Sequence, residues 1–269
     1  MKIAFQGEHG AYSEEAIRAY YGEVETVPCE SFDRVFESVI SSTSDAGLIP
    51  VENSIAGSIH QNYDLLFQHP LHVVGEYVLR VRHCLIALPN VQKADIKKAI
   101  SHPQALGQCA DYLRRHAIQA EQVYDTAGSV KLLKESGARD TAAIASRRAA
   151  ELYGMQILED GIEDNPENYT RFLAIQREAV IPQSDAKTSI AFTLKEQGKF
   201  SKAMTAFASR EIDITKIESR PLQGKPWNYV FYLDLIGASH DETIQRALDE
   251  LGRYTSVLRV LGSYVRFRE

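Results

Sequence analysis

The sequence predicts an α/β protein in two parts, a two-lobed α/β domain followed by a ferredoxin-like βαββαβ unit. The chain has 269 residues, which is long for one compact domain and comfortable for two of about 150 residues each. Short apolar segments alternate with amphipathic ones up to a polar, proline-containing linker at residues 177–186. After the linker the order is strand, helix, strand, strand, helix, strand. We therefore expect domains at residues 1–178 and 187–265.

Composition excludes several classes of function. The 44% apolar and 25% charged content is typical of a globular protein with a core. A net charge of −6 argues against nucleic acid as a partner, because phosphate binding needs a basic surface. The three cysteines lie far apart without a CxxC motif, and no HExxH occurs, so neither a disulfide framework nor a metal site is expected. With no signal peptide and no run of about 20 apolar residues, we expect a cytoplasmic protein that does not enter membranes.

The first lobe is predicted from three strands that each lead into a polar segment. Residues 3–5 form the first strand, and the segment 7–15 opens a helix that Ser13 can cap. A second strand at 24–27 precedes a helix that starts at Ser31. Its core stripe at helical spacing comprises Phe32, Val35, Phe36, Val39 and Ile40. The third strand, 47–51, ends in the polar segment 52–58, where ligands of open α/β sheets are expected.

Two long extended runs, residues 71–79 and 82–88, indicate that the chain crosses into a second lobe and leaves a cleft between the lobes. Pro103 then fits the first turn of a helix that continues to Leu113. Small polar residues follow strands again at 123–130 and 141–146. Each such junction alone is typical of turn chemistry. Their recurrence indicates converging helix N-termini, which would hold a small anionic ligand.

The segment from Asn168 to Phe172 places an amide, a hydroxyl and a guanidinium at the entrance of an apolar strand. Strand ends fix polar groups while water is excluded behind them, so this segment is a candidate for chemistry. In the C-terminal part we expect strands at 188–194, 214–219, 227–236 and 257–265, and helices at 200–210 and 242–254. The sequence of this C-terminal part shows no evident set of catalytic residues. A regulatory or oligomerising role is therefore expected, through an exposed four-stranded sheet.

These segments together resemble the prephenate dehydratase family, in which a catalytic domain similar to a two-lobed periplasmic binding protein precedes an ACT domain. The resemblance covers essentially the whole chain. The matching segments are residues 7–13, 50–54 with 57–58, 101–104 with Gln108, 125–129, 142–146 and 168–172. In the C-terminal part, residues 217–221 with Gly224, Pro226 and Trp227 match the effector-binding segment. The first ACT loop departs from the family, with Gly198-Lys199-Phe200 where Gly-Ala-Leu is usual.

The resemblance implies a monofunctional hydro-lyase that needs no cofactor. It would convert prephenate to phenylpyruvate with loss of water and carbon dioxide, a step toward phenylalanine. By resemblance Thr170 is the hydrogen-bond donor beside the departing hydroxyl, and a positioned proton donor is typically worth about 10² to 10⁴ in rate. The other catalytic residues that it implies are Asn53, Ser101 and Gln108. The substrate-binding residues that it implies are Glu52, Ser54, Thr126, Ser129, Arg171 and Phe172.

The resemblance also implies L-phenylalanine as an effector that binds between the subunits of a homodimer or homotetramer. Backbone groups near Gly198 and the 218–220 strand would meet its charged groups, while its ring packs against Phe200. The effector-binding residues implied in this way are Gly198, Phe200, Glu218, Ser219 and Arg220.

Two alternatives stay open from the sequence. A solute-binding or sensory protein would use the same two-lobed cleft without chemistry, but it would need export or a signalling partner, and neither a signal peptide nor a third domain is evident. An arogenate dehydratase would act on the amino analogue of prephenate. A carboxylate near the substrate's amine would favour this second alternative, and no single residue of the sequence decides it.

Overall fold

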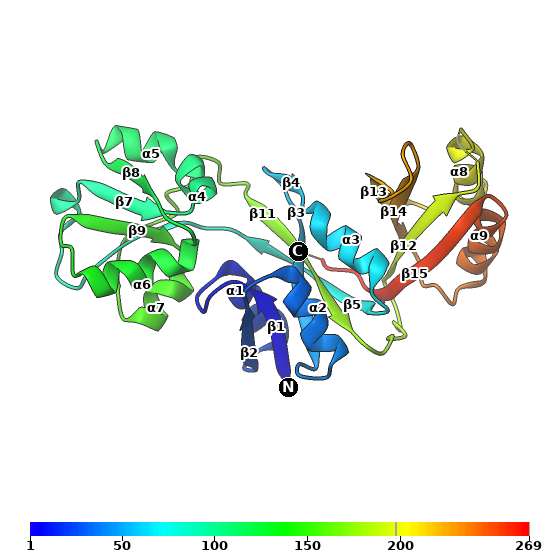
Figure 1. Ribbon diagram of the computed structural model, residues 1–269, viewed down its shortest axis with the longest axis horizontal. Coiled ribbons are helices and arrows are strands. Elements are labelled where there is room, and N and C mark those ends of the chain that lie inside the picture. Colours follow the sequence, from blue (N-terminus) through cyan, green and yellow to red (C-terminus); the bar gives the residue numbers. More distant parts are fainter. Residues whose placement is uncertain (197, 269) are drawn as a thin grey trace.

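The protein contains three sheets. Each sheet belongs to a separate part of the molecule, and the three parts lie in a row (Figure 1). The structure is a computed structural model that describes residues 1–196 and 198–268. We call residues 1–80 with 169–176 lobe 1, residues 84–160 lobe 2, and residues 186–265 the C-terminal unit. Lobe 1 lies in the middle, between the other two.

The sheet of lobe 1 has the order β2-β1-β3-β11-β5, with the short β4 paired to β3. Its strands are β1 (Lys2–Gln6), β2 (Glu25–Cys29), β3 (Ala46–Asn53), β4 (Gly57–Ser58), β5 (His72–Arg80) and β11 (Tyr169–Gln176). Its helices are α1 (Tyr12–Tyr21), α2 (Phe32–Ile40) and α3 (His60–Gln68). Because β11 pairs antiparallel with both β3 and β5, the start of β11 lies beside the carboxyl ends of those two strands.

Helix α2 follows the prediction at its start and departs from it at its end. The Ser31 side chain accepts a hydrogen bond from the Arg34 N–H, as a capping serine does. Val35, Phe36 and Val39 are fully buried, but Ile40 at the C-terminal end is 39% exposed. The predicted cap of α1 is wrong. The helix begins at Tyr12 with Ala11 as its cap position, so Ser13 lies in the first turn.

The sheet of lobe 2 has the order β10-β6-β9-β7-β8. Its strands are β6 (Cys84–Ala87), β7 (Lys98–Ser101), β8 (Gln119–Gln122), β9 (Thr141–Ala145) and β10 (Gln156–Asp160). Its helices are η1 (Lys93–Asp95), α4 (Pro103–Gln108), α5 (Ala110–Arg115), α6 (Thr126–Ser136) and α7 (Arg147–Tyr153). The predicted single helix from Pro103 to Leu113 is two helices, because the chain leaves helical geometry at Cys109.

Two connections join the lobes, as the extended runs predicted. One leads from β5 to β6 and the other from β10 to β11. The lobes also touch at Gly10, whose backbone has a φ of +91° and where an added Cβ would lie 2.8 Å from the Ala149 Cα of α7. Only glycine fits this contact. The Ser146 hydroxyl donates to the Gly10 carbonyl across the same contact, at 2.5 Å.

The C-terminal unit has the predicted order of elements around the sheet β13-β14-β12-β15. It comprises β12 (Ala186–Leu194), α8 (Phe200–Ala208), β13 (Ile214–Pro221), β14 (Tyr229–Ile236), α9 (Glu242–Gly252) and β15 (Thr255–Val265). Helices α8 and α9 cover one face with an apolar core that includes Phe192, Phe207 and Leu251.

The other face of this sheet packs on lobe 1, so the expectation of an exposed sheet is wrong for that face. Tyr232, Leu261 and Tyr264 share one hydrophobic core with Leu66 and Val73 of lobe 1. The approach is close, because a Cβ added to Gly262 would lie 1.9 Å from the Val73 carbonyl oxygen. Lobe 1 and the C-terminal unit therefore form one packed body. Within the described residues, no helix has the length and the apolar run needed to cross a bilayer.

Candidate functional site

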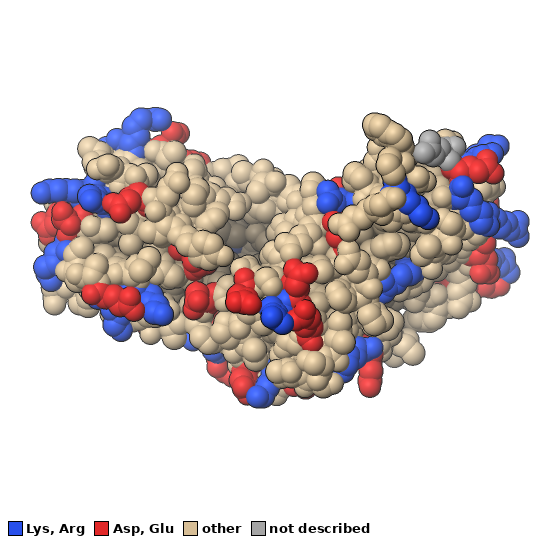
Figure 2. Space-filling view, in the orientation of Figure 1, with Lys and Arg blue, Asp and Glu red and all other residues tan. Residues whose placement is uncertain are grey.

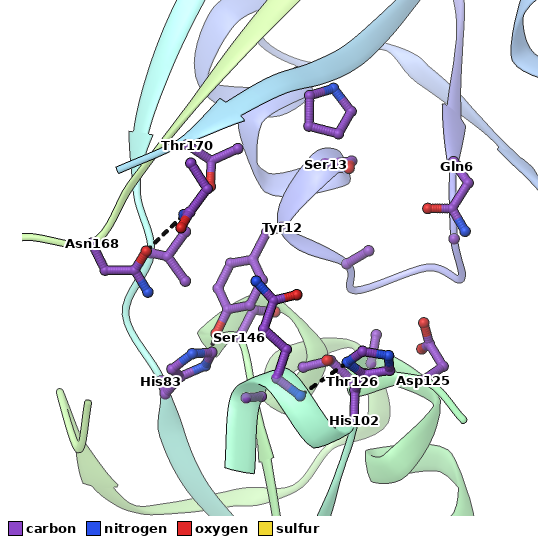
Figure 3. A pocket seen from close by; sticks show the side chains of 18 of the residues that line it. Gln6, Tyr12, Ser13, His83, His102, Asp125, Thr126, Ser146, Asn168 and Thr170 are labelled. Carbon is purple, nitrogen blue, oxygen red and sulfur yellow. Dashed lines mark hydrogen bonds between the residues drawn. The ribbon is translucent and has the colours of Figure 1, made fainter. Parts of the chain in front are cut away.

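A cavity of about 260 Å³ lies between the two lobes. We call it the interlobe cavity. It is lined by lobe 1, by lobe 2 and by both connections between them, and the space-filling view shows the surface hollowed at this point (Figure 2). The labelled side chains in Figure 3 point into it from opposite walls, with Thr170 and Asn168 at one end and Asp125 and Gln6 at the other.

Asn53 is the hub of the hydrogen bonds around Thr170. Its Nδ2 donates to Asn168 Oδ1 at 2.8 Å and lies 3.0 Å from Thr170 Oγ1. Its Oδ1 accepts from the backbone N–H groups of Ile55 and Ala56, which fixes the orientation of the amide. Since Thr170 Oγ1 accepts the amide N–H, the hydroxyl proton of Thr170 stays available for a bound ligand. Thr170 itself is only 9% exposed.

The hydrogen-bonded chain continues from Asn168 to the wall formed by α1. Asn168 Nδ2 donates to Gln108 Oε1 at 3.1 Å, and the same oxygen lies 2.7 Å from His83 Nε2. His83 Nδ1 in turn lies 2.7 Å from the Tyr12 hydroxyl. Burial lowers the pKa of His83, against the smaller opposing effects of Gln108 and Glu163. Because Gln108 Oε1 can only accept, the neutral ring donates from Nε2 to Gln108 and leaves Nδ1 as an acceptor. The one proton of the Tyr12 hydroxyl lies between two acceptors, His83 Nδ1 and the Arg82 carbonyl at 2.9 Å.

Tyr12 keeps its proton in this arrangement. Burial, followed by the nearby Cys84 and Glu15, raises the pKa of Tyr12 well above its usual value. The chain from Tyr12 to Thr170 contains three amide side chains, which do not exchange protons readily. It is therefore suited to hold donors and acceptors in place, and it does not form a path for protons.

The opposite side of the cavity is formed by helix N-termini. The first turn of α1 contributes Tyr12 and Ser13, and the first turn of α6 contributes Thr126 and Ala127. Among the described residues that line the cavity there is no Lys or Arg. Anionic groups would therefore be met by helix N–H groups and neutral donors, as the recurring strand-to-helix junctions predicted.

Five of the residues predicted from the sequence meet in the interlobe cavity. They are Thr170, Asn53, Gln108, Thr126 and Phe172. Two more lie inside lobe 2, where they serve the fold. Ser101 is fully buried and donates to the Ile144 carbonyl at 2.6 Å. Ser129, also fully buried, donates to the Thr126 carbonyl at 2.6 Å.

The other predicted substrate-binding residues also lie outside the cavity. Ser54 donates to the Glu167 carbonyl and accepts from the Tyr169 N–H, so it holds the connection that leads into β11. Glu52 pairs with Lys216 of the C-terminal unit at 3.0 Å.

Arg171 lies on the opposite face of β11 from Thr170, because successive side chains of a strand alternate between faces. Its guanidinium lies 2.7 Å from Glu76 and 2.6 Å from Asp234, and it donates to the Tyr264 hydroxyl at 3.1 Å. Lys187 pairs with the same Glu76 at 2.6 Å. The predicted substrate-binding role of Arg171 is therefore wrong: the side chain joins β11 to the C-terminal sheet.

The residues predicted to bind an effector separate into two places. Gly198 and Phe200 line a cavity of about 200 Å³ in the C-terminal unit, together with Leu194, Trp227, Asn228, Tyr229 and Phe231. We call it the C-terminal cavity. Glu218 accepts from the Ser58 hydroxyl of β4 at 2.5 Å, and Arg220 pairs with Asp64 of α3 at 3.0 Å. Ser219 lies between them on β13, on the alternate, exposed face.

Tyr12 and His83 also line the interlobe cavity, and neither was assigned a role from the sequence. Asn168 lines it too; it belongs to the candidate segment 168–172 but was assigned no role of its own. Asn168 is the first residue of the polar segment before β11, so its position was a usable signal. His83 stands at the start of a long apolar run, where a buried polar side chain needs partners. In the described part of the chain, no group of three or more His, Cys, Asp or Glu side chains is arranged to hold a metal ion.

Comparison with protein families and curated relatives gives consistent matches. The family model for prephenate dehydratase matches residues 3–180. Arogenate dehydratase 1 of Petunia hybrida is 46% identical over 282 residues, which cover 98% of this chain and 66% of that protein. Arogenate dehydratase/prephenate dehydratase 2 of Arabidopsis thaliana is 46% identical over 276 residues, covering 98% and 72%. The chain thus spans about two thirds of the length of these relatives.

The plant relatives contradict one prediction. The proteins from Arabidopsis thaliana are chloroplastic, so the cytoplasmic location predicted from the sequence is wrong on this comparison. Composition and the lack of an evident targeting segment were the only grounds for it, and neither reports a compartment.

Solved structures match over the whole chain. A prephenate dehydratase from Arthrobacter aurescens, in complex with L-Phe, is 29% identical with a TM-score of 0.90, covering 99% of this chain and 90% of that one. GqqA, described as a novel type of quorum quenching acylase, is 32% identical with a TM-score of 0.93 and 98% coverage of both chains.

Proposed function

Because the chain belongs to the prephenate dehydratase family, we propose that it removes water and carbon dioxide from prephenate to give phenylpyruvate. Residues 1–178 are proposed as the catalytic domain and residues 187–265 as an ACT regulatory domain. The hydrogen bond from Asn53 to Thr170 carries the proposal. It occupies the hydroxyl oxygen and leaves the O–H of Thr170 free to donate a hydrogen bond to the departing hydroxyl.

The proposed reaction needs little covalent chemistry from the protein. The bond between the ring and its hydroxyl breaks, and this oxygen leaves as water after gaining a proton from solvent, while Thr170 donates a hydrogen bond to it and keeps its own proton. The bond between the ring and its carboxylate also breaks. Its electron pair enters the ring, which becomes aromatic, and carbon dioxide leaves. The protein has to orient the two leaving groups and to donate to the hydroxyl.

Thr170 is proposed as the donor, held by Asn53, with Asn168, Gln108 and His83 keeping that amide in place. The substrate's carboxylates would lie against the N-termini of α1 and α6, whose N–H groups and dipoles favour negative charge. Phe172 is buried in the cavity wall near α1 and offers the ring an apolar surface. No cofactor is proposed, because each of these tasks uses side-chain or backbone donors.

Arogenate is the second candidate substrate, and the names of the plant relatives favour it. The same bonds break in arogenate, and the product is phenylalanine. The two substrates differ only in the group on the side chain, an amine or a ketone.

Acyl transfer is a reaction of a different class, and we consider it because one similar structure, GqqA, is described as an acylase. It needs a nucleophile activated by a neighbouring base. Among the hydrogen bonds of the described residues, none joins a serine or threonine hydroxyl in the interlobe cavity to a histidine ring. The bonds of His83 go to Gln108 and Tyr12, so this geometry supports the dehydratase.

The test is to incubate the purified full chain with prephenate and, separately, with arogenate. Phenylpyruvate is followed by its ultraviolet absorbance and phenylalanine by chromatography. Prior dialysis against a chelator is expected to leave the rate unchanged. Absence of both products at high enzyme concentration would exclude the proposed function, and dependence of the rate on an added divalent ion would exclude the cofactor-free mechanism.

Regulation by L-phenylalanine is proposed through the C-terminal cavity, because its lining is apolar and includes Phe200 and Phe231, whose ring centroids are 4.6 Å apart. Backbone groups near Gly198 would meet the charged groups of the amino acid. Glu218 and Arg220 are already paired with lobe 1, so they are proposed as links to lobe 1. A homodimer or homotetramer is proposed, with the exposed Ile217 on the edge strand β13 available for a second copy.

A further inference from the structure

The charges that line the interlobe cavity are unequal. Asp125 is the one Asp or Glu among the described lining residues, and no Lys or Arg of the described chain accompanies it there. Prephenate carries two carboxylates, whereas arogenate carries two carboxylates and an ammonium group. A cavity with one fixed negative charge therefore repels both substrates through their carboxylates but attracts arogenate through its ammonium group.

Asp125 lies at the end of the cavity where the side chain of the substrate would be. Thr170 and Asp125 occupy opposite ends of the cavity in Figure 3. In both substrates the leaving hydroxyl and the side chain are attached to ring carbons that face each other across the ring. With the hydroxyl placed at Thr170, the side chain extends toward Asp125.

The Asp125 carboxylate has an oxygen to offer to a ligand. Its Oδ1 accepts from the Gly128 N–H at 2.5 Å and so caps α6. No hydrogen bond from the described residues reaches Oδ2. The ammonium group is a donor with three hydrogens, and the ketone of prephenate has none to give.

The surroundings add to the negative field at this end. A second cleft of about 470 Å³ shares Asp125 with the interlobe cavity. Among its described lining residues, Glu8, Glu30 and Glu135 stand against one cation, Lys131. Acidic side chains also gather below the hollow in Figure 2.

From these observations, and resting on the proposed function, we propose that Asp125 binds the ammonium group of arogenate and makes this chain prefer the amino substrate over prephenate. Asp125 is half-buried in the cavity wall, and recognition of an N–H donor by an acceptor placed to receive it discriminates against an analogue that lacks the donor. The helix N-termini would still hold the carboxylates, so prephenate is expected to remain a slower substrate.

The test compares kcat/KM for arogenate and for prephenate in the wild-type chain and in Asp125→Asn, which keeps the capping oxygen and removes the charge. We expect the wild-type chain to favour arogenate. In the variant, kcat/KM for arogenate is expected to fall about 10- to 100-fold, the loss of one hydrogen bond to a charged group, while the value for prephenate stays level or rises. Asp125→Ser, which also retains a capping hydroxyl, is expected to give the same change in the ratio.

Glu135→Gln is the matched control, because it removes a carboxylate from the second cleft only, and it is expected to leave the ratio of the two kcat/KM values unchanged. A wild-type preference for prephenate, or an equal fall for both substrates in Asp125→Asn and Asp125→Ser, would overturn the role of Asp125 and leave the dehydratase standing. Turnover of neither substrate by the wild-type chain would overturn the proposed function itself, and the inference with it.

Discussion

The Thr170 hydroxyl accepts one hydrogen bond from Asn53 and keeps its own proton for the cavity. Thr170→Ala removes this donor, so we expect turnover to fall by about 10² to 10⁴. Thr170→Ser retains the hydroxyl on a side chain that rotates more freely about χ1, and this variant is expected to keep a measurable part of the activity. Steady-state rates of the two variants check this, and Thr215→Ala, on an exposed position of β13, is the control.

Near-wild-type turnover in both Thr170 variants would remove Thr170 from the mechanism. The comparison is clean because the substitution is small and the Thr170 side chain has one described hydrogen bond to lose, worth about 1 kcal/mol of stability. Melting temperatures measured beside the rates separate lost chemistry from lost folding.

The lowered pKa of His83 predicts that the stability of the protein depends on pH. Burial lowers its pKa below the ordinary value of 6.5, so the folded protein binds fewer protons than the unfolded chain as the pH falls. Its contribution to stability is complete above pH 6.5 and is lost as the pH falls through the lower, folded-state pKa.

We therefore expect the melting temperature of the wild-type chain to fall more steeply between about pH 7 and pH 5 than that of His83→Gln, whose amide does not titrate in this range. The slopes are compared, since the variant also changes hydrogen bonds to Gln108 and Tyr12. Parallel slopes would show that His83 does not titrate on unfolding.

At the scale of elements, Arg259 of β15 holds the C-terminal end of α3. Its guanidinium donates to the carbonyl oxygens of Phe67 and Leu66, and to that of His69 at 2.8 Å. These carbonyls have no partner within the helix. Arg259→Ala is expected to lower the free energy of unfolding by about 1.5 to 3 kcal/mol, measured by urea denaturation.

Arg246→Ala is the matched control for Arg259, since Arg246 lies on α9 in an exposed pair with Glu242, and such pairs contribute about 0.5 kcal/mol or less. An equally small effect for both variants would mean that the contact between α3 and β15 is maintained by its apolar core alone.

The order of elements in the C-terminal unit was predictable because hydrophobic periodicity and turn residues are local signals. In the two lobes the prediction missed α3, β8 and β10. The site was predictable in part. Asn53, Gln108 and Thr170, which were predicted to be catalytic, all line the interlobe cavity, but their network joins positions as far apart as Asn53 and Asn168, 115 residues along the chain. Pairing at that separation depends on the register of β11 against β3, which the sequence alone does not give.

Arg171 shows why neighbouring residues of one motif were misassigned. Alternation along a strand predicts that Thr170 and Arg171 face opposite sides. It does not predict which side holds the ligand. The packing of the C-terminal sheet on lobe 1 decides this, because Asp234 and Glu76 neutralise the guanidinium there. Ser101 and Ser129 were misassigned for a related reason, since a small hydroxyl at a strand-to-helix junction also satisfies buried carbonyls.

At the scale of the whole molecule, the C-terminal cavity predicts how the proposed control by L-phenylalanine can be removed without loss of the proposed catalysis. Phe200→Ala takes away an aromatic wall of that cavity, so we expect the concentration of L-phenylalanine for half-inhibition to rise at least about tenfold, which is about 1.4 kcal/mol. The rate without L-phenylalanine should stay within about twofold, because Phe200 lies outside the interlobe cavity.

Val257→Ala, an exposed apolar position of β15 in the same unit, serves as the control for Phe200→Ala. Inhibition of the Phe200 variant at the wild-type concentration would place the effector elsewhere. Sedimentation of each variant with and without L-phenylalanine shows whether a change of assembly accompanies inhibition.

The C-terminal unit packs on lobe 1, so these two parts form one body, which we call the frame. Lobe 2 forms a second body, which we call the jaw. The frame contains Thr170 and, behind it, Arg171 with Asp234. The jaw is lobe 2, which carries Asp125 and joins the frame through two connections. A rotation about these connections changes the distance between Thr170 and Asp125 and leaves the contact between Arg171 and Asp234 intact. Because the C-terminal sheet packs on lobe 1, an effector bound in the C-terminal unit would act on the reaction through the part of the protein that holds Thr170.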